Sequence, residues 1–303
     1  MLPDEIVKRY RIKDGSKFRL ADFDPADTAG LDIDKTEAKE FLAAGVKRLR
    51  QLQERLYAEA RWSLLVIFQA MDAAGKDSAI EHVMSGVNPQ GCQVTSFKVP
   101  GPTELRHDFL WRTACALPER GRIGIFNRSY YEEVLVVRVH PELLDKQGLP
   151  PALAGKEIWK ERLESIRDHE RHLVRNGTLV LKFFLNVSRD EQRRRFIERI
   201  DAPEKRWKFS LGDVAEAAHW DGYMAAYEDA IRHTATKEAP WYVVPADNKW
   251  FTRLVVAAAI DDRLEKLDPT FPAVAPAMLE QMEQVRARLA GDSKGGKASA
   301  KAG

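Results

Sequence analysis

The segment at 63–84 constrains the fold more than any other part of the sequence. An apolar run at 63–69 is typical of a buried strand, and a loop of small residues follows it and ends in Gly75-Lys76. Residues 77–84 can then begin a helix. Backbone N–H groups at such a loop and helix N-terminus bind anions, and the lysine ammonium neutralises their charge. The order strand, loop, helix therefore predicts a phosphate-binding loop, for which a chance Gly-Lys after a strand is the structural alternative.

The loop differs from the usual G-x-x-x-x-G-K-[ST] pattern at two positions. Ala70 replaces the first glycine, and Asp77 replaces the hydroxyl residue that normally binds magnesium. Asp72 adds a carboxylate inside the loop, where it would repel phosphates unless a cation lay between them. We therefore predict that Asp72 is a magnesium ligand. The residues of this loop that are predicted to bind phosphate are Ala73, Ala74, Gly75, Lys76 and Asp77.

The composition is that of a globular protein with one large core. The chain has 303 residues, of which 44% are hydrophobic and 31% are charged. No apolar run approaches the roughly 20 residues of a membrane span, and residues 1–14 lack the apolar centre of a signal peptide. Cys92 and Cys115 suggest no disulfide framework. We therefore expect a cytoplasmic protein with no membrane partner.

Short apolar strands alternate with helical segments along most of the chain. This alternation predicts an α/β fold with a mostly parallel sheet flanked by helices, in which ligands bind beyond the carboxyl ends of the strands. We expect strands at 63–69, 93–98, 123–126, 179–187 and 241–245, and helices at 36–61, from residue 75, and at 102–116, 130–144, 154–175 and 249–267.

The strand at 123–126 is followed directly by Asn127 and Arg128. An apolar strand that ends in a polar side chain resembles a Walker B element, which usually ends in a metal-binding aspartate. Asn127 would supply a neutral oxygen to the metal, and Arg128 would neutralise charge on a transferring phosphoryl group. The structural alternative makes Asn127 the N-cap of the helix at 130–144 and Arg128 a surface residue.

A basic segment at 189–208 follows the strand at 179–187. It carries eight Arg and Lys residues against five acidic residues, whereas the whole chain has 48 basic and 46 acidic residues and a net charge of only +2. Because the overall charge is nearly balanced, we do not expect nucleic acid as a partner. A basic helix after a core strand can form a lid over phosphates, and the alternative is a solvated helix with i,i+4 ion pairs.

Five motifs together resemble the type 2 polyphosphate kinase family, which consists of polyphosphate:nucleotide phosphotransferases. They lie at 71–77, 87–91, 126–133, 199–210 and 240–250, and the resemblance spans about residues 30–268. It implies a P-loop kinase fold similar to thymidylate kinase, with a helical lid. It also implies reversible phosphoryl transfer between inorganic polyphosphate and nucleotides with Mg²⁺, for which Mn²⁺ is a substitute.

The resemblance assigns roles to residues at matching positions. Asp72, Lys76 and Arg128 are the implied catalytic residues, and Asp72 and Asn127 the implied metal ligands. The sequence after Phe126 resembles the subgroup that acts on both nucleoside mono- and diphosphates, although many family members have Asp at the position of Asn127. An acid at 132 or 133 could bind an adenine amino group, or could be a solvated helix residue. The implied lid residues are Arg194, Arg195, Lys205, Arg206 and Lys208, and the implied nucleotide-binding residues are Asn127, Tyr131, Glu132 and Glu133.

The expected organisation has three parts. Residues 1–30 form an irregular leader, residues 31–268 form the P-loop phosphotransferase domain with its lid at about 189–220, and residues 269–303 form a C-terminal helix and a disordered tail. We expect a homo-oligomer, either a dimer or a tetramer, that acts on AMP and ADP and on GMP and GDP. Two other functions are compatible with the sequence, an ATP-dependent nucleoside monophosphate kinase and a non-enzymatic protein that binds RNA or another polyanion.

Overall fold

The computed structural model describes residues 4–31 and 33–295. The chain separates into two compact units, Met1–Pro269 and Thr270–Gly303. The second unit contains the helix α12, Pro276–Gly295. The first unit contains the sheet and all the residues that the sequence predicts to be functional.

The first unit is built on a six-stranded sheet with the order β1-β6-β5-β2-β4-β3. All paired strands are parallel except β1, which runs antiparallel to β6. The strand β2 lies between β4 and β5, so a crevice opens beyond the carboxyl ends of these three strands. The strands are β1 (Arg11–Ile12), β2 (Ser63–Gln69), β3 (Cys92–Ser96), β4 (Ile123–Asn127), β5 (Thr178–Asn186) and β6 (Trp241–Pro245). The predicted mostly parallel α/β fold is confirmed.

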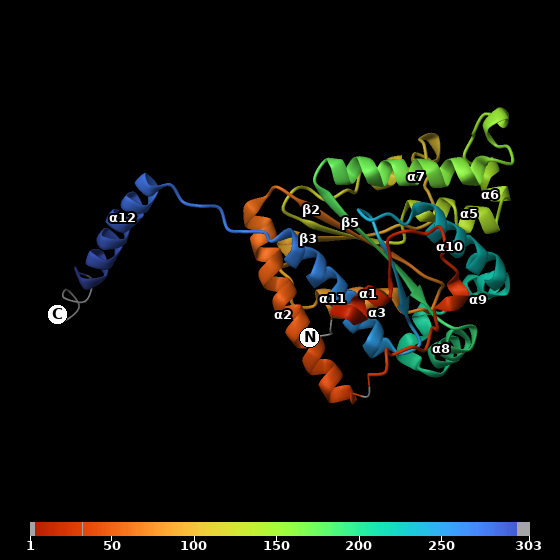
Figure 1. Cartoon of the computed structure of the whole chain (residues 1–303), viewed down its shortest axis with the longest axis horizontal. Helices are drawn as coiled ribbons and strands as arrows, with labels where there is room; N and C mark the ends of the chain where they lie inside the picture. The colour runs from red at the N-terminus through yellow and green to blue at the C-terminus, as the bar shows by residue number, and fades with distance from the viewer. Residues whose placement is uncertain (1–3, 32, 296–303) are drawn as a thin grey trace. The chain divides into compact units, whose positions relative to one another are not determined.

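Helices cover both faces of this sheet (Figure 1), with α2, α3 and α11 packed together on one face and α7 and α10 on the other. Within the described residues, every helix is too short or too polar to pass through a lipid bilayer. The helices of the first unit are α1 (Asp4–Arg9), α2 (Lys35–Glu59), α3 (Lys76–Met84), α4 (Trp111–Ala114), α5 (Val136–Val139), α6 (Glu142–Asp145), α7 (Ile158–Arg175), α8 (Arg189–Asp201), α9 (Leu211–Glu216), α10 (Trp220–Thr234) and α11 (Lys249–Leu267). Short 3₁₀ turns include η3 (Glu104–Arg106), η4 (Tyr130–Glu133), η6 (Pro203–Lys208) and η7 (Ala217–His219).

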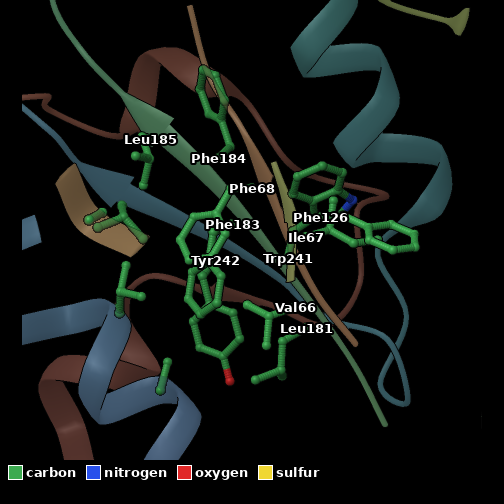
Figure 2. Close-up of a cluster of buried hydrophobic side chains, with 14 of the residues drawn as sticks. Val66, Ile67, Phe68, Phe126, Leu181, Phe183, Phe184, Leu185, Trp241 and Tyr242 are labelled. Carbon is green, nitrogen blue, oxygen red and sulfur yellow. The ribbon is translucent and has the colours of Figure 1, made fainter. Parts of the chain in front are cut away.

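An aromatic stack fixes the register of the central strands (Figure 2). Phe68 on β2 is paired with Phe183 on β5, which is paired in turn with Tyr242 on β6. Each pair of rings stacks with its centroids 5.2 Å apart. A slip of one residue would turn these rings to the opposite face of the sheet, so the stack holds the strand ends, and the residues that follow them, at fixed positions.

Residues 4–30, the described part of the expected irregular leader at 1–30, are more regular than the sequence analysis predicted. The helix α1 packs against α11, and β1 pairs with the edge strand β6 through Arg11 opposite Tyr242 and Ile12 opposite Trp241. Strand β1 therefore covers a sheet edge that would otherwise expose unpaired backbone groups.

Two predicted helices are broken in the structure. The segment 102–116 forms only η3 and α4, because the Asp108 carboxylate accepts the Leu110 N–H and holds the backbone in a turn. The segment 130–144 forms η4, α5 and α6. Leu135 leaves the helical region at φ −110° and ψ −80°, and Pro141 has no N–H to donate to a preceding turn.

The C-terminal helix extends further than predicted. α12 continues to Gly295, so residues 291–295 are helical although the tail was expected to be disordered from residue 291. Residues 296–303, where the same expectation applies, lie outside the described residues.

Asp261 on α11 is a buried carboxyl group with a shifted protonation equilibrium. The residue is 7% exposed and lies beside a cavity of about 350 Å³ that is lined mainly by α2 and α11. Its Oδ1 atom has no hydrogen-bond partner among the described residues. Burial raises the pKa of Asp261 to about 8, and the Arg48 guanidinium opposes this shift only in part.

The substitution Asp261→Asn should make the stability of the protein less dependent on pH. An unfolded aspartate titrates near ~3.9, whereas the folded pKa is about 8, so the folded state binds more protons and loses stability as the pH rises between these values. As the pH rises from 4 to 9, the free energy of unfolding of the wild type should fall by roughly a few kcal/mol more than that of the variant. Urea denaturation at both pH values measures this, and parallel pH curves for the two proteins would contradict it.

Candidate active site

The predicted phosphate-binding loop lies between β2 and α3 and has the predicted strand–loop–helix order. Ala73 and Gly75 adopt left-handed backbone conformations, with φ of 61° and 104° respectively. Gly75 adopts its conformation without steric strain because glycine has no Cβ. Among the described residues, no side chain caps the N-terminus of α3 at Gly75. The first N–H groups of this helix therefore point at the loop without a side-chain partner, which suits an anion.

Lys76 is folded into the loop. Its Nζ donates to the carbonyl oxygen of Ala70 at 2.7 Å and lies 3.5 Å from that of Met71. Burial and the neighbouring Arg128 guanidinium lower the pKa of Lys76. An anion bound in the loop would favour the ammonium form and so oppose both effects.

Arg128 connects the end of β4 to the loop through two carboxylates. One terminal nitrogen donates to Asp72 at 2.9 Å, and the other donates to Glu132 at 3.2 Å. Glu132 also accepts from Gln69 at 2.8 Å. These carboxylates, Glu132 above all, raise the pKa of Arg128. Arg128 has φ of 64° and donates its backbone N–H to the Phe68 carbonyl oxygen. This hydrogen bond fixes the backbone of Arg128, and so the direction in which its side chain leaves β4.

Asn127 is the last residue of β4 and donates from Nδ2 to the Asp77 carboxylate at 2.7 Å. The alternative that made Asn127 a helix N-cap is wrong, because Ser129 takes that role and accepts the N–H of Tyr131. Asn127 therefore lies beside the loop, as the Walker B comparison predicted.

Two predicted lid arginines occupy different environments. Arg195 is 4% exposed and donates to the carbonyl oxygens of Ala73, Ala74, Ala246 and Asp247 at 2.6–3.1 Å. Its neighbour Arg194 is exposed, pairs with Glu191 and Glu198, and does not line the crevice beyond the carboxyl ends of the strands. The structure therefore assigns Arg195 to the support of the loop backbone, and Arg194 to ion pairs on the helix surface.

A cleft of about 730 Å³, which we call the central cleft, brings most of the predicted residues together at the carboxyl ends of the strands. Eight basic and four acidic side chains line it, so it suits a ligand with several negative charges. The basic ones are Lys76, Lys98, Arg128, Arg195, Arg199, Lys205, Lys208 and Lys249, and the acidic ones are Asp72, Asp77, Glu198 and Asp213.

Three predicted nucleotide-binding residues do not line the central cleft. Tyr131 has no exposed surface and donates to Glu170 at 2.8 Å, because its hydroxyl needs a partner inside the core. Glu133 is 3% exposed and bonds to Gln147 and Arg162. Neither side chain can touch a nucleotide in this structure. Glu132 accepts a hydrogen bond from Arg128 and does not line the cleft. The predicted lid residue Arg206 does not line it either, and donates to the Ile200 carbonyl.

Several residues that line the central cleft, and one that supports its loop, escaped the sequence analysis. Lys98 follows the end of β3, and Lys249 follows β6, so the rule that ligands bind beyond strand ends would have found both. Gln192 donates to the Asp72 carbonyl at 2.9 Å and ties α8 to the loop. Asp213 faces the loop from α9, and burial together with Asp72 raises its pKa.

Comparisons with known proteins agree with this geometry. The family model described as Polyphosphate kinase 2 (PPK2) matches residues 32–272. An ADP-polyphosphate phosphotransferase of Rhodopseudomonas palustris is 51% identical over 284 residues, which are 93% of this chain and 98% of that protein. An AMP/ADP-polyphosphate phosphotransferase of Meiothermus ruber is 47% identical over 88% of this chain and 96% of its own. The crystal structure of polyphosphate kinase 2 from Arthrobacter aurescens superposes with a TM-score of 0.82 at 42% identity, over 91% of this chain and 95% of that one. The chain therefore belongs to the polyphosphate kinase 2 family, which the family model and these relatives show and with which the arrangement of the central cleft agrees.

Proposed function

We propose that this protein transfers phosphoryl groups, reversibly, between inorganic polyphosphate and nucleoside mono- and diphosphates. The observation that carries the proposal is the central cleft, where a phosphate-binding loop and an arginine between two carboxylates face an excess of basic side chains. The relatives from R. palustris and M. ruber are named for the same reaction on ADP and on AMP and ADP.

The residues of the cleft suit a direct transfer. The terminal phosphoanhydride bond of polyphosphate breaks as a bond forms to a phosphate oxygen of the nucleotide, and no covalent enzyme intermediate is needed. Lys76 and the N-terminus of α3 would hold the transferring phosphate, and Arg128 would stabilise charge on its oxygens. Asp72 and Glu132 would keep Arg128 aimed at that position.

We also propose that Mg²⁺, or Mn²⁺ in its place, is the cofactor and that Asp72 and Asn127 hold it. Among the described residues, no group of three or more His, Cys, Asp or Glu side chains forms a metal cluster. Magnesium fits this donor set, because it binds through one or two carboxylates and otherwise through water and substrate phosphates. Asp72 lines the cleft, and Asn127 donates through Nδ2, which leaves its carbonyl oxygen as a donor to the metal. When bound, the ion would neutralise phosphate charge.

The choice of donor tests the proposal. Purified protein with Mg²⁺ and ADP or AMP should convert polyphosphate into nucleoside tri- and diphosphates, followed by ³¹P NMR. Turnover with ATP and AMP, but none with polyphosphate, would instead identify a nucleoside monophosphate kinase. Binding of polyphosphate without any turnover would identify a polyanion-binding protein.

We expect AMP as well as ADP to be an acceptor. Asn127 places a neutral side chain against Asp77. A metal held by Asp72 and Asn127 would have one anionic ligand fewer than with an aspartate at 127, and it would position the acceptor phosphate less strictly. The substitution Asn127→Asp would set two carboxylates against each other and should reduce the use of AMP relative to ADP. A time course from AMP alone, free of adenylate kinase, measures this. If the wild type leaves AMP unchanged while it consumes ADP, the assignment to both acceptors is wrong.

The neighbouring arginines of α8 should respond differently to alanine substitution. Arg195→Ala removes the donor from four backbone carbonyls and should lower turnover at least about tenfold, because a buried charged hydrogen bond contributes roughly 1.5–3 kcal/mol. Arg194→Ala removes only surface ion pairs and should stay within about twofold of the wild type. Steady-state kinetics with both substrates varied compares them. A rise in the KM for polyphosphate alone in Arg195→Ala would identify a phosphate ligand instead.

We further propose that the protein acts in the cytoplasm as a homo-oligomer. The free thiols of Cys92 and Cys115 are compatible with a reducing compartment. Light scattering of the purified protein measures its mass in solution, and a monomer would contradict the second part of the proposal.

A further inference from the structure

One exposed aromatic side chain lines the central cleft. Trp207 on η6 is 79% exposed, and the other aromatic residue that lines the cleft, Phe97, is buried at 7%. Val99 also lines the cleft and is 91% exposed, but it is aliphatic and has no ring. An indole that remains in water loses the free energy that burial would give, so its position at a ligand cleft indicates a ligand with an apolar face.

Lys208 holds the ring of Trp207 from one side. Its Nζ lies 5.0 Å from the ring centroid, which is a cation–π distance. The ammonium covers one face of the indole, and the high exposure of Trp207 leaves surface free for a second contact. Lys205 lines the same cleft. A molecule with a planar apolar group next to phosphates would therefore meet an aromatic ring and two cations together.

Only one of the two proposed substrates has such a group. Polyphosphate has charged oxygens along its whole length and no apolar surface, so an indole adds nothing to its binding. A nucleotide carries a base that stacks on aromatic rings. The sequence analysis assigned the adenine amino group to Glu132 or Glu133. Glu133 is buried, and Glu132 accepts from Arg128 and Gln69 and does not line the cleft. The base therefore needs another site.

We propose that Trp207 is the stacking platform for the nucleobase of the acceptor nucleotide, an inference that rests on the proposed function. Trp207 contacts the base, and the neighbouring Lys208 and Lys205 contact the phosphates of either substrate. Stacking recognises the flat face of a base and not its edge, so this platform accepts both adenine and guanine.

Steady-state kinetics of three variants test the platform. Trp207→Ala should raise the KM for ADP about ten- to hundredfold and leave the KM for polyphosphate within about twofold, because base–aromatic stacking contributes about that factor. Trp207→Phe should recover most of the loss because it keeps a ring. Leu211→Ala is the matched control, since Leu211 is also 79% exposed on the lid but does not line the cleft, and it should behave like the wild type.

Binding measurements separate stacking from lid closure. The difference in tryptophan fluorescence between the wild type and Trp207→Phe reports the contribution of Trp207. ADP should quench this contribution, whereas inorganic tripolyphosphate, which has no base, should not. Equal rises in both KM values, no recovery by Trp207→Phe, or equal quenching by tripolyphosphate would overturn the proposal and leave Trp207 a closing role. If the wild type transfers no phosphate, the proposed function fails, while the titration with ADP still tests Trp207.

Discussion

Lys76→Ala should reduce phosphoryl transfer by about 10²–10³-fold while the protein remains folded. Lys76 lies inside the loop with its Nζ 2.7 Å from the Ala70 carbonyl oxygen, at the N-terminus of α3, where an anion would replace this contact. Removal of one preorganised donor from a transferring group typically costs ~10²–10³ in turnover. Asp72→Asn should have a comparable effect, because it removes one of the two anionic partners of Arg128 and a proposed metal ligand.

The control for this prediction is Lys39→Ala, an exposed lysine on α2 outside the central cleft. It should retain wild-type turnover, and all three variants should show wild-type circular dichroism and thermal unfolding. If Lys76→Ala or Asp72→Asn keeps more than about a tenth of the wild-type turnover, the loop does not carry the chemistry.

Lys182→Met should lower the free energy of unfolding by about 3–5 kcal/mol, because it leaves a buried carboxylate without its cation. Lys182 has no exposed surface and Glu170 is 1% exposed. Lys182 pairs with Glu170 and also donates to the Thr234 carbonyl at 2.8 Å, while Tyr130 and Tyr131 donate to Glu170. Burial lowers the pKa of Lys182 and raises that of Glu170, and the attraction within the pair opposes both shifts.

The double variant Lys182→Met/Glu170→Gln distinguishes the pair from the packing around it. A glutamine oxygen still accepts from the two tyrosines and carries no charge, so we expect the double variant to be more stable than Lys182→Met alone. Urea denaturation of the wild type, the two single variants Lys182→Met and Glu170→Gln, and the double variant gives the coupling free energy. A single variant as stable as the wild type would show that the ion pair does not hold this region together.

The elements that the sequence predicted well are those whose neighbours in the chain determine their burial. The strand at 63–69 and the helix at 249–267 have the predicted bounds, because an unbroken apolar run and a helical periodicity each require one buried surface. The pairing of Phe68 with Phe183 could not be predicted, since strand order is set by contacts between segments far apart in the chain.

The site was predictable where a residue follows directly from a strand end, and not where a distant partner decides. Asp72, Lys76 and Arg128 come together because β2 and β4 are adjacent. Tyr131 turns inward because Glu170, 39 residues away in the sequence, accepts its hydroxyl. Arg195 looks like any other arginine of a basic helix in the sequence, and only the position of the Ala73 and Ala74 carbonyls gives it a structural role.

Hydrogen bonds from two side chains attach the first half of α8 to the phosphate-binding loop. Gln192 and Arg195 fasten it to the backbone at Asp72, Ala73 and Ala74, and Arg195 fastens it also to the chain beyond β6. Among the described residues, the second half of α8 has no such hydrogen bond to the loop and is bonded instead to η6 and α9 through Arg206 and Asp213. A shift of the loop around an arriving phosphate would therefore move α8, and with it η6, so the first substrate to bind would set the position in which the second is received.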